Sequence, residues 1–425
     1  MKMPRHHLPA SKAPRMNAIY QSFTDELQRL KTHDQFRQLR DIDGRNLTDI
    51  NVAGTHYVNL SSNDYLGLGA DAKLLDEFFA AYPGDDPLTR FGMTSSSSRL
   101  LTGNTCTYTG LERDVMELYQ TEAACVFNSG YHANVGIISA LAGTHDLVLS
   151  DKLNHASIID GLKLSGARFM RYRHCDYDHL ADLLEKHHKK YRRIFLITES
   201  VFSMDGDVAD LARLVELKQR YNAFLIIDEA HAIGVFGKRG GGICEAQGVT
   251  PEIDIIISPL GKAMASLGAV AAMGAVMRDY LVNTMRPLIF TTALPPIVLH
   301  WNRFILRKIA SMEQERQHVQ HLARQLRAAL TAQGLTSGGD SQIVPVIIGE
   351  NQAAVTVADA LQQRGFLVFA IRPPTVPPNT ARLRLSLSAA LSWAQIRELP
   401  NIIGAILHEK PVDHPRSSPK SDSVL

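Results

Sequence analysis

The sequence Phe224-Leu-Ile-Ile-Asp228-Glu-Ala-His231 joins a short apolar run to an acid and a histidine. A second apolar run, Ile255-Ile-Ile-Ser-Pro-Leu-Gly, leads directly to Lys262. Short, continuous apolar runs are typical of strands that are buried on both faces of a parallel sheet. The two segments therefore predict that Asp228 and Lys262 lie at the ends of buried strands.

Similar apolar runs alternate with amphipathic stretches from about residue 105 to residue 275. Apolar residues recur at helical intervals at 111–119 and 211–221, between the runs. This alternation predicts an α/β fold with a mostly parallel sheet flanked by helices, because parallel strands are joined by crossover connections. The predicted strands are 124–127, 146–149, 168–172, 194–198, 224–228, 253–257 and 269–273.

The patterns on either side predict the domain organisation. Residues 1–55 are expected to form an N-terminal arm with a helical pattern at 16–40, followed by a large domain at 56–300. Pro295-Pro296 open a long helical pattern that leads to a smaller α+β domain at 301–410. In that domain we expect strands at 343–348, 366–369 and 382–387, and helices at 352–364 and 393–408.

The composition is that of an ordinary globular protein and excludes several classes of function. A net charge of +2 gives no electrostatic basis for nucleic-acid binding. The four cysteines show no C-x-x-C spacing, so neither a metal site nor a disulfide framework is indicated. The N-terminus is polar and no long uncharged apolar run occurs, so we predict a cytoplasmic protein without a membrane partner. Residues 1–15 and 411–425 are predicted to be disordered from their composition.

Polar groups follow several predicted strands, at the edge where ligands of open α/β sheets bind. Gly130 and Tyr131 open a helix after a strand, and backbone N–H groups at a helix start can hold a phosphate. His155, Ser203 and His231 follow other strands. A flat imidazole can stack on an aromatic cofactor, and hydroxyl or imidazole groups can bind its oxygen atoms.

Each of these residues also has a structural alternative when it is taken alone. Asp228 and Ser203 could cap helices, His155 could make a hydrogen bond at a helix start, and Lys262 could be a surface lysine. Asp-Glu-Ala-His could indicate a helicase box, but that requires an upstream G-x-x-x-x-G-K-[ST] motif, which the sequence lacks. The shared position of these residues at strand ends favours one ligand site.

An acid and a lysine presented in this way suit pyridoxal phosphate. The lysine can form a Schiff base with the cofactor, and the acid can keep the pyridine nitrogen protonated so that the ring accepts electrons. The helix start at Gly130 offers a place for the phosphate. We therefore expect pyridoxal 5'-phosphate as the cofactor.

The sequence from about residue 36 to residue 408 resembles the α-oxoamine synthase family of fold-type I pyridoxal phosphate enzymes. The resemblance implies an aspartate aminotransferase-like fold and a decarboxylative condensation of an amino acid with an acyl thioester. The motifs that carry it are Ser61-Ser-Asn-Asp-Tyr-Leu-Gly-Leu, Asn128-Ser-Gly-Tyr-His-Ala-Asn, Asn154-His-Ala-Ser, Thr198-Glu-Ser-Val-Phe-Ser-Met-Asp-Gly-Asp, Asp228-Glu-Ala-His, Gly261-Lys-Ala and Phe290-Thr-Thr-Ala-Leu-Pro-Pro.

The resemblance also implies roles for individual residues. The implied catalytic residues are Lys262 as the Schiff-base lysine, Asp228 on the pyridine nitrogen and His155 stacked on the ring. The implied cofactor-binding residues are Gly130, Tyr131, His155, Ser203, Asp228, His231, Lys262, Thr291 and Thr292. The implied substrate-binding residues are Arg37, Asn63, His155, Thr375 and Arg384, with Arg384 and Asn63 on the amino acid carboxylate. Thr291 and Thr292 match a segment that approaches the phosphate from a partner subunit, which implies a homodimer.

The segment Ala370-Ile-Arg-Pro-Pro-Thr-Val-Pro-Pro is similar to the branch of the family that uses L-alanine and a pimeloyl thioester in biotin synthesis. The acyl carrier, coenzyme A or a carrier protein, stays open. Two alternatives are a 2-amino-3-ketobutyrate ligase or another branch with a different amino acid or acyl-CoA, and a catalytically silent protein with the same fold. One residue departs from the family pattern: Pro259 stands where a phosphate-binding Thr is usual, and Ser258 could take over that hydroxyl's role.

Overall fold

The computed structural model describes residues 18–33, 35–81 and 86–408. The chain divides into two compact units, Met1–Ile42 and Asp43–Leu425. In the first unit, helix α1 (Ala18–Thr32) falls within the range where a helical pattern was predicted. The segments 1–15 and 411–425, which were predicted to be disordered, lie outside the described residues. The domain boundaries at residues 55, 300 and 410 stay predictions.

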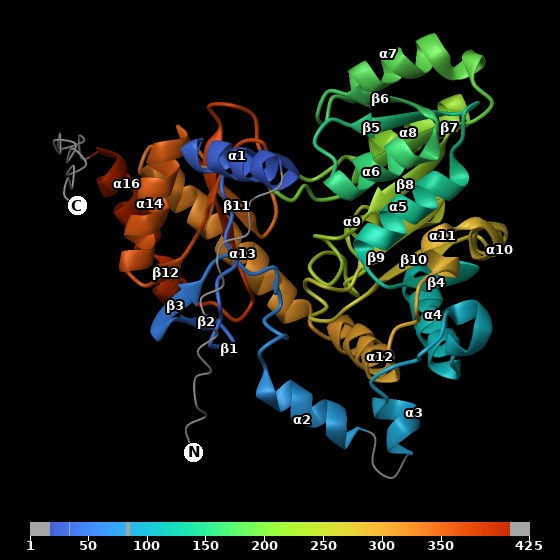
Figure 1. The fold of residues 1–425 in the computed structure, drawn as a ribbon, viewed down its shortest axis with the longest axis horizontal. Coiled ribbons are helices and arrows are strands. Elements are labelled where there is room, and N and C mark those ends of the chain that lie inside the picture. The colour runs from blue at the N-terminus through green and yellow to red at the C-terminus, as the bar shows by residue number, and fades with distance from the viewer. Residues whose placement is uncertain (1–17, 34, 82–85, 409–425) are drawn as a thin grey trace. The chain divides into compact units, whose positions relative to one another are not determined.

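The second unit is built around a seven-stranded sheet with the order β4-β10-β9-β8-β7-β5-β6 (Figure 1). All neighbouring pairs are parallel except the two that β10 makes with β4 and β9. The loop 260–268 is too short for a crossover helix, so β10 returns antiparallel to β9. The predicted α/β fold with a mostly parallel sheet is confirmed. The strands are β4 (Ala123–Phe127), β5 (Leu147–Asp151), β6 (Arg168–Tyr172), β7 (Ile194–Glu199), β8 (Phe224–Asp228), β9 (Ile255–Pro259) and β10 (Ala269–Met273).

Helices cover both faces of this sheet. Side chains alternate along a strand, so Leu225 and Ile227 of β8 belong to one apolar cluster and Ile226 to the other. Such double burial explains why the strands read as continuous apolar runs. The elements around the sheet are η1 (Arg99–Gly103), α4 (Cys106–Tyr119), α5 (Gly130–Leu141), α6 (Ala156–Ser165), α7 (Tyr177–His187), η2 (His188–Lys190), α8 (Leu211–Tyr221), α9 (Ile243–Ala246), η3 (Thr250–Glu252), α10 (Ala275–Thr284) and α11 (Arg286–Ile289).

Two smaller sheets lie in the same unit. The first is antiparallel and has the order β11-β14-β13. In the second, β3 pairs in parallel with β12, so a segment that precedes the large sheet in sequence joins one that follows it. Their elements are β1 (Gly44–Asn46), β2 (Asp49–Val52), β3 (Thr55–Asn59), β11 (Ile343–Gly349), α14 (Asn351–Gln363), β12 (Phe366–Leu367), β13 (Ala370–Ile371), β14 (Ala381–Ser386), α15 (Trp393–Ile396) and α16 (Leu399–His408).

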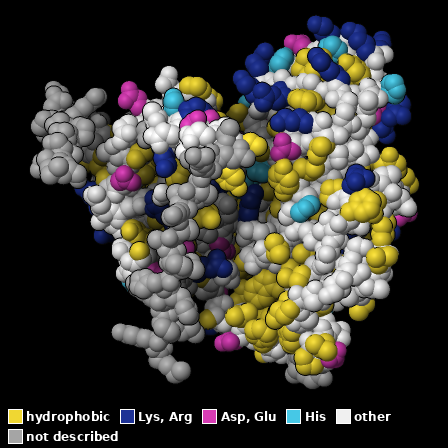
Figure 2. All heavy atoms as spheres, in the orientation of Figure 1, with side chains coloured by type: hydrophobic (Ala, Val, Ile, Leu, Met, Phe, Trp, Pro, Cys, Tyr) yellow, Lys and Arg dark blue, Asp and Glu magenta, His cyan; other side chains and the backbone are white. Residues whose placement is uncertain are grey.

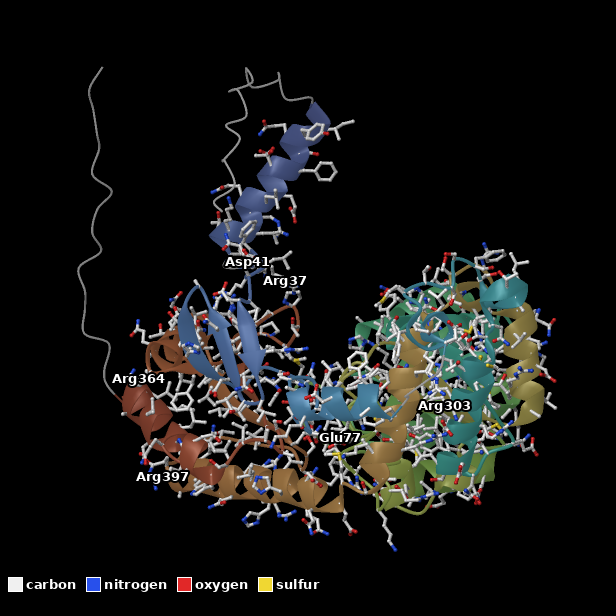
Figure 3. The ribbon with its side chains drawn as sticks, turned by 90° about the horizontal axis from the view of Figure 1, so that it is seen from below. Arg37, Asp41, Glu77, Arg303, Arg364 and Arg397 are labelled. Carbon is white, nitrogen blue, oxygen red and sulfur yellow. The ribbon has the colours of Figure 1, made fainter. Side chains whose placement is uncertain are left out.

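The long helical pattern after Pro295 forms two helices, α12 (Pro296–Ala310) and α13 (Glu313–Ala332). Helix α12 packs beside α2 (Ala72–Ala80), α3 (Pro87–Phe91) and α4, where Lys308 pairs with Glu77 at 2.8 Å and Arg303 with Asp114 at 2.6 Å (Figure 3). Figure 2 shows hydrophobic side chains gathered on the surface over α2, α3 and α12. Among the described residues, no helix combines the length and apolar character that a membrane crossing requires.

Asp146, just before β5, is a buried charge that should contribute strongly to stability. Its Oδ2 accepts hydrogen bonds from Arg193 at 2.7 Å, Arg192 at 3.1 Å and the Gly143 N–H at 2.9 Å. Burial alone would raise the pKa of this carboxyl, but the hydrogen bonds from Arg193 and Arg192 outweigh it and hold the pKa well below its usual range.

We therefore expect Asp146→Ala to lower the free energy of unfolding by about 1–3 kcal/mol, because two half-exposed guanidinium groups and the Gly143 N–H lose a buried carboxylate partner. Asp279→Ala, which removes an exposed ion pair with Arg278, should cost less than about 1 kcal/mol. Urea unfolding monitored by circular dichroism measures both. Since the folded pKa is depressed, the Asp146 contribution should be present at neutral pH and fade below about pH 4. Equal losses in both variants would contradict this account.

Candidate active site

The carboxyl ends of three adjacent strands bring Asp228 and Lys262 together. Glu199 at the end of β7 lies level with Asp228 at the end of β8, and Asp228 lies level with Ile257 of β9. Lys262 follows β9 after a short turn. The two charged groups therefore approach each other from neighbouring strands, as the apolar runs predicted.

Asp228 is a buried acceptor that neighbouring donors hold in place. Its Oδ2 accepts a hydrogen bond from Asn134 Nδ2 at 2.7 Å, and its Oδ1 accepts one from the Ala230 N–H at 2.9 Å. A carboxylate oxygen can accept more than one hydrogen bond, so acceptor capacity remains for a pyridinium N–H. Asn134 comes from α5 and also donates to Ser157 Oγ at 2.9 Å. Asn134 was not predicted from the sequence as a site residue.

Lys262 presents an amine that is partly deprotonated near neutral pH. Burial lowers the pKa of Lys262 to about 8, although the charges of Asp228 and Glu199 act in the opposite direction. Its Nζ lies 2.8 Å from His231 Nε2. An unprotonated amine is the form that attacks a carbonyl or accepts a proton, so this environment suits the chemistry predicted for Lys262.

Glu199 is a buried acid beside this pair that the sequence analysis did not assign. Burial, and then the charge of Asp228, raise the pKa of Glu199 to about 8. Its Oε1 accepts a hydrogen bond from the His155 backbone N–H at 2.6 Å. The carboxyl therefore fixes the start of α6. Glu199 directly follows the predicted strand 194–198, and this position could have predicted it as a site residue.

His155 caps α6, which matches the predicted hydrogen bond at a helix start. Its ring also faces the site. Its Nδ1 accepts the Ser157 N–H at 3.2 Å and lies 2.8 Å from Ser157 Oγ. A backbone N–H can only donate, so Nδ1 is the acceptor and Nε2 carries the ring proton. Burial lowers the pKa of His155, with Asp228 opposing, which keeps the imidazole neutral. Stacking on a cofactor stays a prediction.

Arg384 of β14 and Asn63 of the turn after β3, both predicted to bind a carboxylate, are brought together. Arg384 Nη2 lies 3.1 Å from Asn63 Oδ1 and 3.1 Å from the Tyr65 hydroxyl. Tyr65 in turn lies 2.6 Å from His231 Nδ1. Burial, then the charges of Lys262 and Arg384, lower the pKa of His231 well below its usual value, so the ring is neutral. Tyr65 belongs to the motif Ser61-Ser-Asn-Asp-Tyr-Leu-Gly-Leu, but no role was predicted for it.

The predicted phosphate turn lies at the start of α5. Ser129 caps this helix by accepting the His132 N–H at 3.2 Å, while the earlier N–H groups of a helix have no partner within it. A Cβ at Gly130 would lie 2.5 Å from Pro259 Cγ, so glycine is required where Pro259 packs against the turn. Tyr131 is half exposed and donates to Asp160 at 2.7 Å.

Ser258 does not take over the hydroxyl role that Pro259 leaves open. Its Oγ lies 2.7 Å from the hydroxyl of Tyr119, and both residues are buried in the core. Because side chains alternate along β9, Ser258 faces the core beside α4 while Pro259 faces α5. The hydroxyl of Ser258 is therefore turned away from the phosphate turn.

The other predicted residues lie around this centre. Thr292 accepts a hydrogen bond from Asn128 Nδ2 through its carbonyl at 2.8 Å, just before the predicted phosphate turn of the same chain. Ser203 accepts from Arg384 Nε through its carbonyl, and Ser203 and Thr375 line a small cavity of about 130 Å³. Arg37 belongs to the first unit, in the segment after α1, and its part in the site stays a prediction (Figure 3).

These groups fit pyridoxal phosphate. A buried carboxylate with spare acceptor capacity, an amine with a lowered pKa and a glycine helix start are present at one sheet edge. They match the needs of the pyridine nitrogen, the aldehyde carbon and the phosphate respectively.

Gly130→Ala should destabilise the protein by about 1–3 kcal/mol, because the added Cβ meets the Pro259 ring. Adding Pro259→Ala removes the nearer ring atom and should restore part of the loss. Gly274→Ala, whose Cβ would meet its nearest neighbour at 3.6 Å, is the matched control. Thermal unfolding measures all of these variants. Additive losses in the double variant would show that Gly130 and Pro259 do not constrain each other.

Comparisons with known proteins identify the family of this chain. The family model for aminotransferase class I and II matches residues 55–403. The 8-amino-7-oxononanoate synthase of Chlorobaculum parvum is 52% identical over 388 residues, which cover 91% of this chain and 99% of that protein.

Two solved structures are similar along most of their length. A serine palmitoyltransferase from S. paucimobilis with PLP and myriocin bound has 30% identity and a TM-score of 0.83, covering 92% of this chain and 97% of that one. The 8-amino-7-oxononanoate synthase from Francisella tularensis has 29% identity and a TM-score of 0.71, covering 82% and 97%. The chain therefore belongs to the aminotransferase class I and II family and, within it, to the pyridoxal phosphate-dependent α-oxoamine synthases.

Proposed function

We propose that this protein condenses L-alanine with a pimeloyl thioester, with loss of carbon dioxide, to form 8-amino-7-oxononanoate in biotin biosynthesis. The observation that carries the proposal is a chain of hydrogen bonds that runs from Arg384 and Asn63, through Tyr65 and His231, to the amine of Lys262. The similarity to the Chlorobaculum parvum synthase supports this choice of amino acid and acyl group.

The residues around the sheet edge would hold the cofactor. Lys262 would bind its aldehyde carbon and Asp228 would keep a proton on the pyridine nitrogen. The remaining cofactor contacts in the proposal come from Gly130, Tyr131, His155, Ser203, His231, Thr291 and Thr292. When it is bound, pyridoxal phosphate supplies an electron-withdrawing ring that acidifies the Cα–H of the amino acid.

The protein's own groups then orient the reactants and move protons. Arg384 and Asn63 bind the carboxylate of alanine, which fixes the direction of the Cα–H bond. Lys262, as a free amine, takes the Cα proton, a task that its pKa of about 8 allows. His155 carries its ring proton on Nε2 and can donate it to the carbonyl oxygen of the thioester. Arg37 and Thr375 would contact the acyl substrate.

An assay with purified protein tests the reaction. Alanine and a pimeloyl thioester should yield the amino ketone and one free thiol. Lys262→Ala should lose the visible absorbance of the lysine-linked cofactor and at least about 10²-fold in turnover, and Asp228→Asn about 10²–10³-fold. Lys308→Ala, on an exposed ion pair, should keep both. Turnover with glycine in place of alanine would favour a 2-amino-3-ketobutyrate ligase, and a protein without the chromophore would favour a silent role.

We also propose a homodimer in the cytoplasm, with Thr291 and Thr292 reaching the phosphate of the partner subunit. Exposed apolar side chains surround that segment: Phe290 is 70% exposed, Leu101 80% and Leu88 79%. Large exposed apolar areas mark interaction sites. The four cysteines are free thiols, which agrees with a reducing compartment. The carrier of the acyl group, coenzyme A or a carrier protein, stays open.

Phe290→Asp should weaken the dimer, because it places a charge in the proposed interface, and should lower cofactor retention if the neighbouring threonines act across it. Sedimentation velocity measures the first effect and absorbance after dialysis the second. Leu47→Asp, at an exposed apolar residue of the turn between β1 and β2, is the control. An unchanged dimer in Phe290→Asp would contradict the proposed interface.

A further inference from the structure

The Tyr65 hydroxyl stands at the centre of a hydrogen-bond network that joins the carboxylate site to Lys262. Tyr65 is fully buried. Its oxygen lies 2.9 Å from Asn63 Oδ1, 3.1 Å from Arg384 Nη2 and 2.6 Å from His231 Nδ1. On the far side of the imidazole, His231 Nε2 lies 2.8 Å from Lys262 Nζ.

The direction of each hydrogen bond can be assigned by starting from Arg384, whose N–H groups can only donate. Arg384 can only donate, so the Asn63 atom that faces its Nη2 is the oxygen. The Tyr65 hydroxyl faces the same oxygen and must therefore donate to it. With its one hydrogen used, Tyr65 accepts from both Arg384 Nη2 and His231 Nδ1. The proton of His231 thus lies on Nδ1, and its Nε2 lone pair accepts from Lys262.

Arg384 has little capacity left for a substrate in this state. Its Nε donates to the Ser203 carbonyl, its Nη1 to Ser386 Oγ at 2.7 Å and both hydrogens of Nη2 to Asn63 and Tyr65. Within the described part of the chain, one N–H of Nη1 has no hydrogen-bond acceptor and could bind a ligand. A two-pronged hydrogen bond to a carboxylate therefore requires Arg384 to exchange one of these contacts.

We propose that Tyr65 is a positioning residue that couples carboxylate binding at Arg384 to the proton on His231, and through it to Lys262. The inference rests on the proposed function for the role of Arg384. When a carboxylate takes the Nη2 hydrogen that faces Asn63, Asn63 Oδ1 moves away, and the Tyr65 hydroxyl, which has lost its acceptor, turns to donate to His231 Nδ1. The imidazole loses its Nδ1 proton to solvent and gains one on Nε2 from the Lys262 ammonium. Lys262 is left as the neutral amine, and one proton is released in total.

The environment of Lys262 supports this coupling. The groups that face its amine are Asp228 from β8, Glu199 from β7, Arg384 from β14 and His155 from the start of α6, besides His231. Of these, only His231 contacts the amine directly in the hydrogen bonds of the described chain, and Tyr65 decides which of its nitrogens is the acceptor. The Tyr65 hydroxyl therefore acts on Lys262 without touching it.

Competitive acetylation of the full-length protein without cofactor tests the role of Tyr65. The rate at Lys262 as a function of pH, followed by peptide mass spectrometry, reports the pKa of the amine. In Tyr65→Phe the Nδ1–H loses its acceptor, the proton moves to Nε2 and the neutral amine is favoured. The Lys262 midpoint should fall by about one pH unit, the size of one hydrogen bond.

Tyr119→Phe is the matched control, because it removes another buried hydroxyl, whose side-chain hydrogen bond within the described residues is to Ser258. Its Lys262 midpoint should equal that of the wild type. An unchanged or raised midpoint in Tyr65→Phe, or an equal fall in Tyr119→Phe, would overturn the proposal. Asn63→Leu, which removes the acceptor of the Tyr65 hydrogen but keeps the hydroxyl, should also lower the midpoint. It provides the same test if Tyr65→Phe does not fold.

The coupling to the carboxylate has its own readout. Propionate, a carboxylate that has no amino group to react, is added to the full-length protein without cofactor, labelled with ¹⁵N in its histidine rings. The His231 signals, assigned with His231→Gln, should change from the Nδ1–H to the Nε2–H form, and Tyr65→Phe should give the Nε2–H form without propionate. A proton that stays on Nδ1 would overturn the coupling. Neither readout uses the acyl thioester, so a failed turnover assay with shifted midpoints would reject the proposed function alone.

Discussion

The pairing of β8 with β9 in one parallel register is the constraint on which the site depends. It brings the buried carboxylate of Asp228 and the amine of Lys262 to the same edge of the sheet. Burying an unpaired carboxylate costs several kcal/mol, and hydrogen bonds from Asn134 and the Ala230 N–H offset that cost. The negative charge at this edge is therefore stable before any ligand arrives, and it can stabilise a positive charge without reorganisation.

The same burial adjusts the neighbouring groups. Low polarity disfavours every charged form, so the pKa of Lys262 falls and that of Glu199 rises, each to about 8. The two groups exert opposite charges on each other, which limits both changes. An amine and an acid that both titrate near neutral pH form a proton-handling cluster, which is a common property of catalytic sites.

The arginine proposed to bind the substrate carboxylate comes from a different sheet. Arg384 lies on β14 of the small antiparallel sheet, and its guanidinium reaches the Ser203 carbonyl beyond β7 and the turn at Asn63. Arg382, two residues earlier, forms an ion pair with Asp205 of the same loop. The loop after β7 is thus held by two arginines of the small sheet. A ligand that displaces contacts of Arg384 acts on residues from both sheets at once.

The sequence could predict much of the fold and the ends of the strands for a simple physical reason. A strand buried on both faces must be apolar throughout, so the runs at 124–127, 224–228 and 269–273 could be predicted as strands. Polar residues directly after the parallel strands lie at one edge of the sheet. Resemblance to a family added Arg384 and Asn63, which no local pattern distinguishes. The antiparallel direction of β10 and the break between α12 and α13 did not follow from periodicity, because both depend on loop length and packing.

By itself, the sequence determined which residues end the buried strands and hence that an acid, a lysine and histidines share an edge. Only the tertiary structure decided that Asn134 from α5 supports Asp228, that Glu199 beside it holds the His155 N–H, and that Tyr65 joins Arg384 to His231. It also decided that Ser258 faces the core while Pro259 closes on Gly130. Hydrogen bonds between segments far apart in the chain depend on distances of a few tenths of an ångström, which neither periodicity nor composition encodes.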